Sequence, residues 1–273
     1  PFGGVLLPNN LSHITNDAMK KTSGNYVLLM SPSEVCLDPA NIERALTFLD
    51  SQPGLSVVSC PTKIFEDGEH VRTLMMPKII RRDKVNLTGL LADNFFPCND
   101  TNWTLSAAGL SFMDHGDCKP RREILNLKIL LKAYLDMETA GAKAPHQIAI
   151  KVGEGLIGLN PKKAVEVLGQ LVKRYHVGAT EAAVALGLLA RAEEEMGYWI
   201  AADEHYNRSI ATLPTVSALL GYGFFIQKRG SFGWLDDLRK AVTMAREITN
   251  YDVDLRELRR AQEIIADAER VMT

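Results

Sequence analysis

The chain has 273 residues, of which 46% are hydrophobic and 23% charged, a composition ordinary for a globular protein that buries a sizeable core. The formal net charge is −2. This balance argues against nucleic acid or an anionic membrane as a partner, because binding to phosphate groups requires clustered excess lysine and arginine. No apolar run approaches the roughly 18 residues of a membrane-spanning helix.

The cysteines give no sign of a metal or redox site. None of the pairs among Cys36, Cys60, Cys98 and Cys118 has C-x-x-C spacing, and no signal peptide opens the sequence as given. We therefore expect reduced thiols and a protein of the cytoplasm or of an assembled particle.

The first part of the chain, residues 1–120, is predicted to form a mixed α/β layer, because short apolar runs alternate with turns that contain Pro and Gly. Asp38 and Pro39 are expected to start a helix, with Asp38 as the N-cap, and Pro53-Gly54 to end it. Residues 66–69 are expected to form the turn of a β-hairpin. The other predicted elements are a helix at 11–22, a buried strand at 26–30, and strands at 55–60, 71–75, 78–82 and 110–113.

The second part, residues 121–273, is predicted to be all-α, because apolar residues follow a period near 3.6 over long stretches. The first helix covers residues 121–139. Helical hairpins and a closing helix follow, at 145–176, 180–213, 215–249 and 253–272. The sequence thus predicts an α/β domain followed by a helical solenoid.

The middle hairpin carries large apolar and small residues at regular positions, glycine at the turn, and a final Pro214. These residues are Leu186, Leu189, Ala190, Gly197, Ala202, Tyr206 and Ser209. In this pattern the hairpin resembles the tetratricopeptide repeat, a helix pair used for protein binding. The spacing between hairpins is irregular, so a generic helical-hairpin solenoid remains the alternative.

Residues 24–39 read GNYVLLMSPSEVCLDP, and IIRR at 79–82, LTGLLAD at 87–93 and DHG at 114–116 follow in this order. With these landmarks, residues 9–135 resemble the second half of a family-2 glycosyltransferase catalytic domain, in particular the bacterial subgroup that appends tetratricopeptide repeats. At the positions of the first segment the family has a glycine-containing turn, an apolar strand, D-x-D-E and then a helix that starts with proline.

The resemblance implies chemistry that this sequence has lost in part. The family's two metal-binding carboxylates, which hold Mn²⁺ or Mg²⁺ on a nucleotide-sugar, correspond to Ser31 and Ser33. Hydroxyls are poor ligands for these hard cations. Glu34 and His115 are the remaining candidate metal ligands, and Asp93 is the candidate catalytic base at the position of the family's H-E pair. The strands that would bind the base and ribose are also absent from the sequence as given.

Two functions follow as hypotheses. The first is a non-catalytic structural or protein-interaction protein that uses its helical repeats for assembly or partner binding, as a virion or scaffold component would, and needs no cofactor. The alternative is an active nucleotide-sugar-dependent glycosyltransferase, completed by a missing segment or another chain. We expect the partner-binding residues to lie on the first helices of the hairpins, at His146, Leu156, Ile157, Arg191, Glu194, Leu219 and Ile226.

Overall fold

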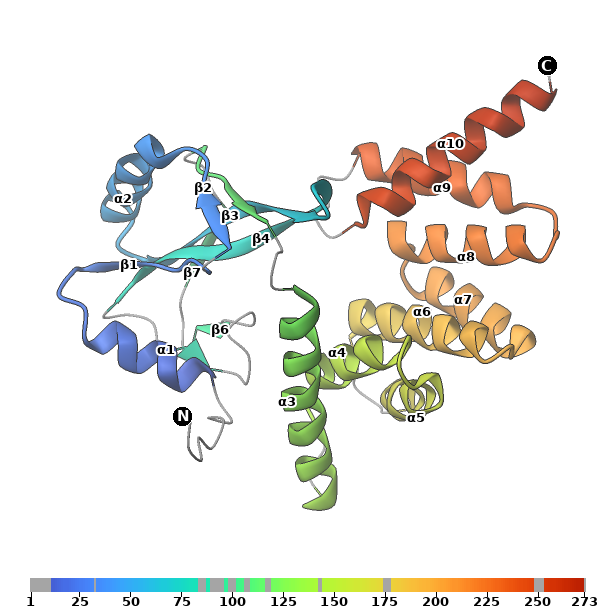
Figure 1. The fold of residues 1–273 in the computed structure, drawn as a ribbon, viewed down its shortest axis with the longest axis horizontal. Helices are drawn as coiled ribbons and strands as arrows, with labels where there is room; N and C mark the ends of the chain where they lie inside the picture. The colour runs from blue at the N-terminus through green and yellow to red at the C-terminus, as the bar shows by residue number, and fades with distance from the viewer. Residues whose placement is uncertain are drawn as a thin grey trace. The chain divides into compact units, whose positions relative to one another are not determined.

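The computed structural model divides the chain into two compact units, Pro1–Arg122 and Glu123–Thr273. The boundary predicted from the sequence lies two residues earlier, at 120/121. Each unit is considered by itself (Figure 1). The structure describes residues 11–31, 33–82, 87–88, 96–97, 102–105, 109–115, 119–141, 144–173, 178–247 and 253–272.

The first unit is built on a mixed sheet with the strand order β1-β4-β3-β8-β2, and β7 also pairs with β3. Strand β3 is parallel to β7 and β8 and antiparallel to β4. Two short strands, β5 and β6, form a separate pair. The strands are β1 (Tyr26–Leu28), β2 (Glu34–Cys36), β3 (Leu55–Glu66), β4 (Glu69–Arg81), β5 (Leu87–Thr88), β6 (Phe96–Pro97), β7 (Asn102–Leu105) and β8 (Phe112–Asp114).

Helices cover both faces of this sheet (Figure 1). Helix α2 (Ile42–Ser51) packs Ala45 and Leu49 against Val58. Helix α1 (Leu11–Lys20) contributes Met19 to a second cluster with Val57. Neighbouring residues of a strand point to opposite faces of the sheet. Val57 of β3 therefore packs on the side of α1, and Val58 packs on the side of α2.

The long β3–β4 hairpin was expected as separate shorter strands. Its turn follows the prediction, because Asp67 and Gly68 both have positive φ, at 52° and 80°, as a type I′ turn requires. The return strand, however, runs without interruption from Glu69 to Arg81. Its pairing shifts between Val58 and Ser59 of β3, and this shift leaves Lys78 as the extra residue of a β-bulge.

Two local predictions in the first unit are wrong. Strand β1 was expected to be buried, but it lies at the edge of the sheet and Leu28 is exposed. Asp38 makes no side-chain cap; a 3₁₀ turn, η1 (Pro39–Asn41), precedes α2 instead. The Asp38 carboxylate accepts a hydrogen bond from Ser111 Oγ at 2.8 Å, so it ties this turn to the segment before β8.

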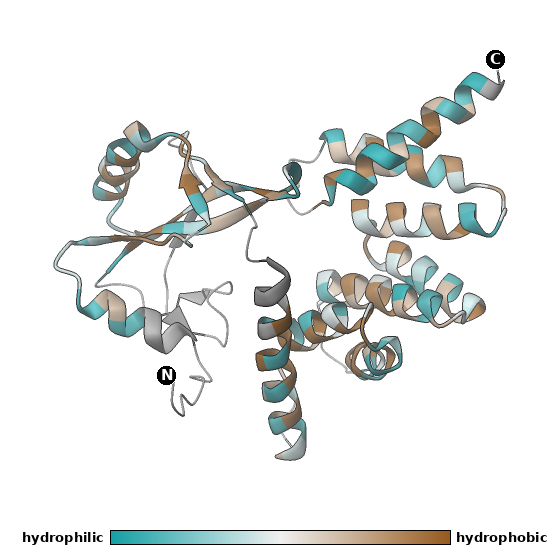
Figure 2. Cartoon of the chain, in the orientation of Figure 1, coloured by the Kyte–Doolittle hydropathy of each residue, from teal (hydrophilic) through white to brown (hydrophobic). Residues whose placement is uncertain are grey.

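The second unit is all-α, and the predicted order of a mixed sheet followed by helices is confirmed. Figure 2 shows hydrophobic and hydrophilic residues alternating around its helices, as amphipathic helices require. None of the helices in the described ranges combines the length and apolar character that crossing a membrane takes. The helices are α3 (Lys119–Thr139), α4 (His146–Leu156), α5 (Pro161–Val172), α6 (Ala179–Glu195), α7 (Trp199–Thr212), α8 (Val216–Lys228), α9 (Trp234–Glu247) and α10 (Leu255–Met272).

Small residues bring the two helices of each hairpin close together. A Cβ added to Gly153 of α4 would lie 2.5 Å from the Leu168 side chain of α5, and one added to Gly223 of α8 would lie 2.6 Å from Leu238 of α9. In the middle hairpin, Ser209 of α7 is fully buried and donates a hydrogen bond to the carbonyl of Ala183 in α6 at 2.7 Å. The same close approach therefore recurs in successive hairpins through different residues.

Candidate functional sites

The strands of the first unit bring the predicted metal-site residues together. Strands β2 and β8 pair in antiparallel register, with Glu34 opposite Asp114. The backbone N–H of His115 donates to the carbonyl of Ser33 at 3.1 Å. The hydroxyls of Ser31 and Ser33 lie 2.9 Å apart. The segment before β2 and the end of β8 thus meet.

The carboxylate of Glu34 is already neutralised within the unit. Its Oε1 accepts from Lys78 Nζ at 2.7 Å, and its Oε2 accepts from the backbone N–H of Ser31 at 2.9 Å. Both side chains of the Lys78–Glu34 ion pair are only 3% exposed. The β-bulge directs Lys78 inward from β4, and the ammonium group also lies 5.1 Å from the centre of the Phe112 ring.

This arrangement does not fit a divalent cation. A metal ion would need the same carboxylate oxygens that Lys78 and Ser31 occupy, and it would lie beside the positive ammonium group. The His115 side chain is exposed, and its ring centre lies 6.4 Å from that of Phe65. Within the described residues no group of three or more His, Cys, Asp or Glu side chains could hold a metal. The candidate base Asp93 lies outside the described residues.

Lys78 is the residue of this site that the sequence reasoning missed. The pattern at residues 78–82 indicated only a short strand, with nothing to show that a bulge would turn the lysine inward. The signal available was indirect. A lysine in an apolar stretch of strand, followed by Ile79 and Ile80, is expected to need a buried counter-charge if its neighbours are buried.

The predicted partner face of the second unit is only partly exposed. Leu156, Ile157, Leu219 and Ile226 are buried, so the expectation that their side chains face a partner is wrong. The physical reason is that other helices of the unit cover these side chains. Ile226 lies in a buried cluster with Ala190 and Tyr206 of the preceding hairpin. Leu219 lies in one with residues of α9 and α10. His146 is half-buried at the start of α4, whereas Arg191 of α6 is exposed.

Glu194 takes part in a polar and aromatic cluster instead of standing free. Its carboxylate accepts from Lys228 Nζ of α8 at 3.3 Å and from Tyr206 Oη of α7 at 3.3 Å. Burial and then the carboxylate of Glu194 raise the pKa of Tyr206 above its ordinary value. Lys228 Nζ also lies 5.6 Å from the centre of the Trp199 ring. Glu194 therefore links three helices of the stack.

Glu257 of α10 has a raised pKa, chiefly because it is desolvated by burial, while the charge of Arg191 acts in the opposite direction. A carboxyl whose folded-state pKa is raised contributes stability below its unfolded-state pKa and loses that contribution as the pH rises through the folded value. We expect Glu257→Gln to leave stability nearly unchanged near pH 4 and to increase it at pH 7. Urea unfolding at the two pH values measures the difference.

The matched control for this prediction is Glu263→Gln, because the side chain of Glu263 is exposed on the same helix. A Glu257→Gln variant that gains no more stability at pH 7 than at pH 4 would contradict the predicted desolvation of this carboxylate.

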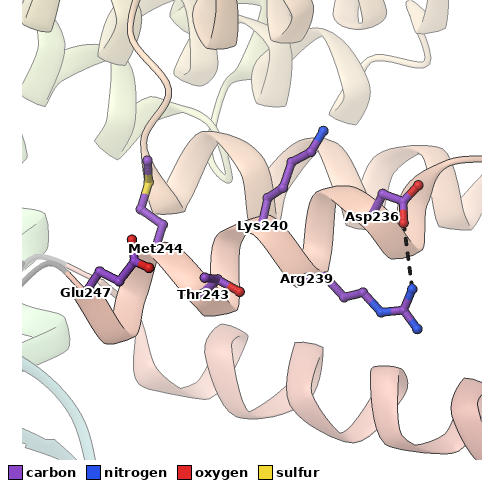
Figure 3. A pocket seen from close by; sticks show the side chains of 6 residues that line it. All are labelled: Asp236, Arg239, Lys240, Thr243, Met244 and Glu247. Atoms are coloured by element: carbon purple, nitrogen blue, oxygen red, sulfur yellow. Dashed lines mark ion pairs between the residues drawn. The ribbon is translucent and has the colours of Figure 1, made fainter.

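A shallow pocket lies along one face of α9 (Figure 3). Arg239 within it forms ion pairs with Asp236 at 3.7 Å and with Glu269 of α10 at 2.9 Å. Because two acidic and two basic side chains line it, the pocket favours no ligand of one charge. It is lined by Asp236, Arg239, Lys240, Thr243, Met244 and Glu247.

No protein-family model and no curated protein matches this sequence.

Proposed function

We propose that this chain is a non-catalytic protein-interaction protein that binds a partner through its helical unit. The observation that carries the proposal is the buried Lys78–Glu34 pair. In the glycosyltransferase family that residues 9–135 resemble, acidic side chains at this position hold a metal on a nucleotide-sugar. Here the surviving carboxylate is matched by a lysine of the same chain.

The pair opposes metal-dependent transfer for an electrostatic reason. A divalent cation stabilises the charge that develops on a leaving diphosphate, and it must reach both the carboxylate and the substrate to do so. To expose Glu34 to a metal, the chain would have to separate a buried ion pair and leave Lys78 uncompensated, which is costly. Ser31 and Ser33, hydrogen-bonded to each other, supply no charge to offset that cost.

The helical unit is the part that we assign to partner binding. Its hairpins share the close helix contacts at Gly153 and Gly223, and its middle hairpin buries Ala202, Tyr206 and Ser209. These features support a tetratricopeptide-like stack, a class of fold that presents extended surfaces to other proteins. A scaffold or assembly role in the cytoplasm or in an assembled particle agrees with this proposal.

The test is a thermal-unfolding titration of the full chain with a panel of nucleotide-sugars in the presence of Mn²⁺. We expect no increase in Tm that depends on both the metal and the sugar nucleotide. A clear increase that Asp93→Ala abolishes, accompanied by sugar transfer to an acceptor, would overturn the proposal in favour of an active glycosyltransferase. The matched control is Asp67→Ala, at the exposed turn of the β3–β4 hairpin.

A further inference from the structure

The turns inside successive hairpins of the second unit expose large apolar side chains. Leu159, in the turn between α4 and α5, is 68% exposed, and Ile200, at the start of α7, is 85% exposed. Phe232, between α8 and α9, is fully exposed. We call these residues, together with Tyr198 and Trp199, the turn edge.

The repetition of this feature at the turn of each hairpin distinguishes the turn edge from scattered exposed residues. Figure 1 shows the α6–α7 and α8–α9 turns at the same end of their helices. Because hairpins of a solenoid stack side by side, equivalent turns form a continuous border. Single exposed apolar residues need no explanation, but a row of them indicates a surface that another molecule covers.

The centre of the turn edge is held in place by the rest of the unit. The Trp199 ring lies 6.2 Å from the buried Phe225 ring, and Lys228 Nζ lies over the indole at 5.6 Å. Lys228 is in turn fixed by its ion pair with Glu194. A preorganised aromatic side chain loses little conformational entropy on binding, which is why Trp and Tyr are common anchors of protein interfaces.

The charges beside the turn edge indicate what it binds. Lys163 and Lys228 are already paired with Glu166 and Glu194. The cationic side chains that remain for a partner are Lys162, after Leu159, and Arg229, before Phe232, so one lies at each end of the row. A second copy docked antiparallel would place these two basic ends against each other. Charge therefore disfavours self-association and favours a partner with acidic groups at its ends.

We propose that the turn edge binds a segment of another protein that carries apolar side chains flanked by acidic residues. This inference rests on the proposed function, since it names the surface and the class of partner that the helical unit would use. It differs from the face predicted from the sequence, whose apolar residues are buried.

The probe is a library of random 12-residue peptides displayed on phage and selected on the full chain. We expect the selected sequences to combine apolar or aromatic residues with flanking Asp or Glu. Binding of the consensus peptide, measured by fluorescence anisotropy, should weaken at least about tenfold in a Leu159→Ser, Ile200→Ser, Phe232→Ser triple variant, because truncated interface anchors each commonly cost more than about 1 kcal/mol.

Matched controls separate this surface from the rest of the unit. Val184→Ser removes an exposed apolar side chain near the start of α6, away from the turns, and should leave binding unchanged. Lys162→Glu with Arg229→Glu should weaken binding of the acidic peptide, whereas Arg246→Glu, at the end of α9, should not. Equal urea midpoints of the variants and the unmodified chain would show that folding is unaffected.

The inference would be overturned if none of the selected peptides bound the triple variant more weakly than the unmodified chain. It would also be overturned if the consensus peptide carried basic residues beside its apolar ones. A dimer in sedimentation analysis that the triple variant dissociates would identify a second copy as the occupant. Binding to vesicles with 30% phosphatidylserine that the triple variant abolishes would identify a lipid surface. Peptides whose binding is unchanged in the triple variant but is lost in Arg191→Glu would overturn this inference. They would still agree with the proposed function, because the helical unit would bind them at another surface.

Discussion

Replacing Glu34 by alanine is expected to destabilise the sheet unit by about 3–5 kcal/mol, because removing one partner of a buried ion pair leaves the other charge uncompensated. The Lys78 side chain is 3% exposed and Glu34 is its 2.7 Å partner, so the substitution leaves the lysine buried without this counter-charge. Lys78→Ala should have an effect of similar size for the same reason. Urea unfolding followed by hydrogen exchange at residues 55–81 measures the loss in this unit specifically.

The control for this prediction replaces both charges at once. Glu34→Leu with Lys78→Met keeps the volume of the pair and removes both buried charges, and such replacements are often neutral or stabilising. The exposed pair Lys163–Glu166 provides a second comparison, and Glu166→Ala should change stability little. If Glu34→Ala lowers the free energy of unfolding no more than the double variant does, Lys78 is not buried against Glu34. The Glu34 carboxylate would then be open to a metal ion.

Tyr206→Ala is expected to destabilise the helical unit by about 3–5 kcal/mol, because a large aromatic side chain leaves a cavity that its neighbours fill only in part. Tyr206 is 2% exposed, and its ring centre lies 5.8 Å from that of Tyr222 and 5.3 Å from that of Phe225. Tyr206→Phe keeps the ring and loses only the hydrogen bond to Glu194, so it should cost about 1 kcal/mol. Urea unfolding of each variant gives the two values.

Tyr198→Ala is the matched control for this prediction. Tyr198 lies in the turn of the same hairpin and is exposed, so its removal should change the free energy of unfolding by no more than about 0.5 kcal/mol. Equal losses in Tyr198→Ala and Tyr206→Ala would contradict the packing of the middle hairpin. A loss confined to Tyr206→Ala would support it and would leave Tyr198 available for the turn edge.

Local patterns in the sequence were sufficient for the order and type of most elements. The glycine-containing turn after residue 66 and the apolar periods of the helical half depend on interactions between near neighbours, which sequence spacing reports directly. Near residue 120 the sequence changes from short apolar runs to long helical periods, and this point lies two residues from the division between the compact units. Repeated apolar positions such as Ala202 and Leu238 are buried, because an amphipathic helix has one face that must be covered.

The candidate sites were less accessible to this reasoning, because they depend on contacts between residues far apart in the chain. Lys78 meets Glu34 across 44 positions, and only the register shift in the β3–β4 hairpin turns the lysine inward. Helical periodicity identified an apolar face containing Leu219 and Ile226, but it could not tell whether a neighbouring hairpin or a partner covers that face.

The sequence by itself thus determined the order of a mixed sheet followed by helical hairpins. Only the tertiary structure decided that the Glu34 carboxylate is neutralised by Lys78, and that the large apolar side chains of the turn edge stay exposed. The physical reason is that periodicity reports which residues must be buried together within an element. Which charge compensates which, and which apolar side chains stay uncovered, is set by how distant elements pack.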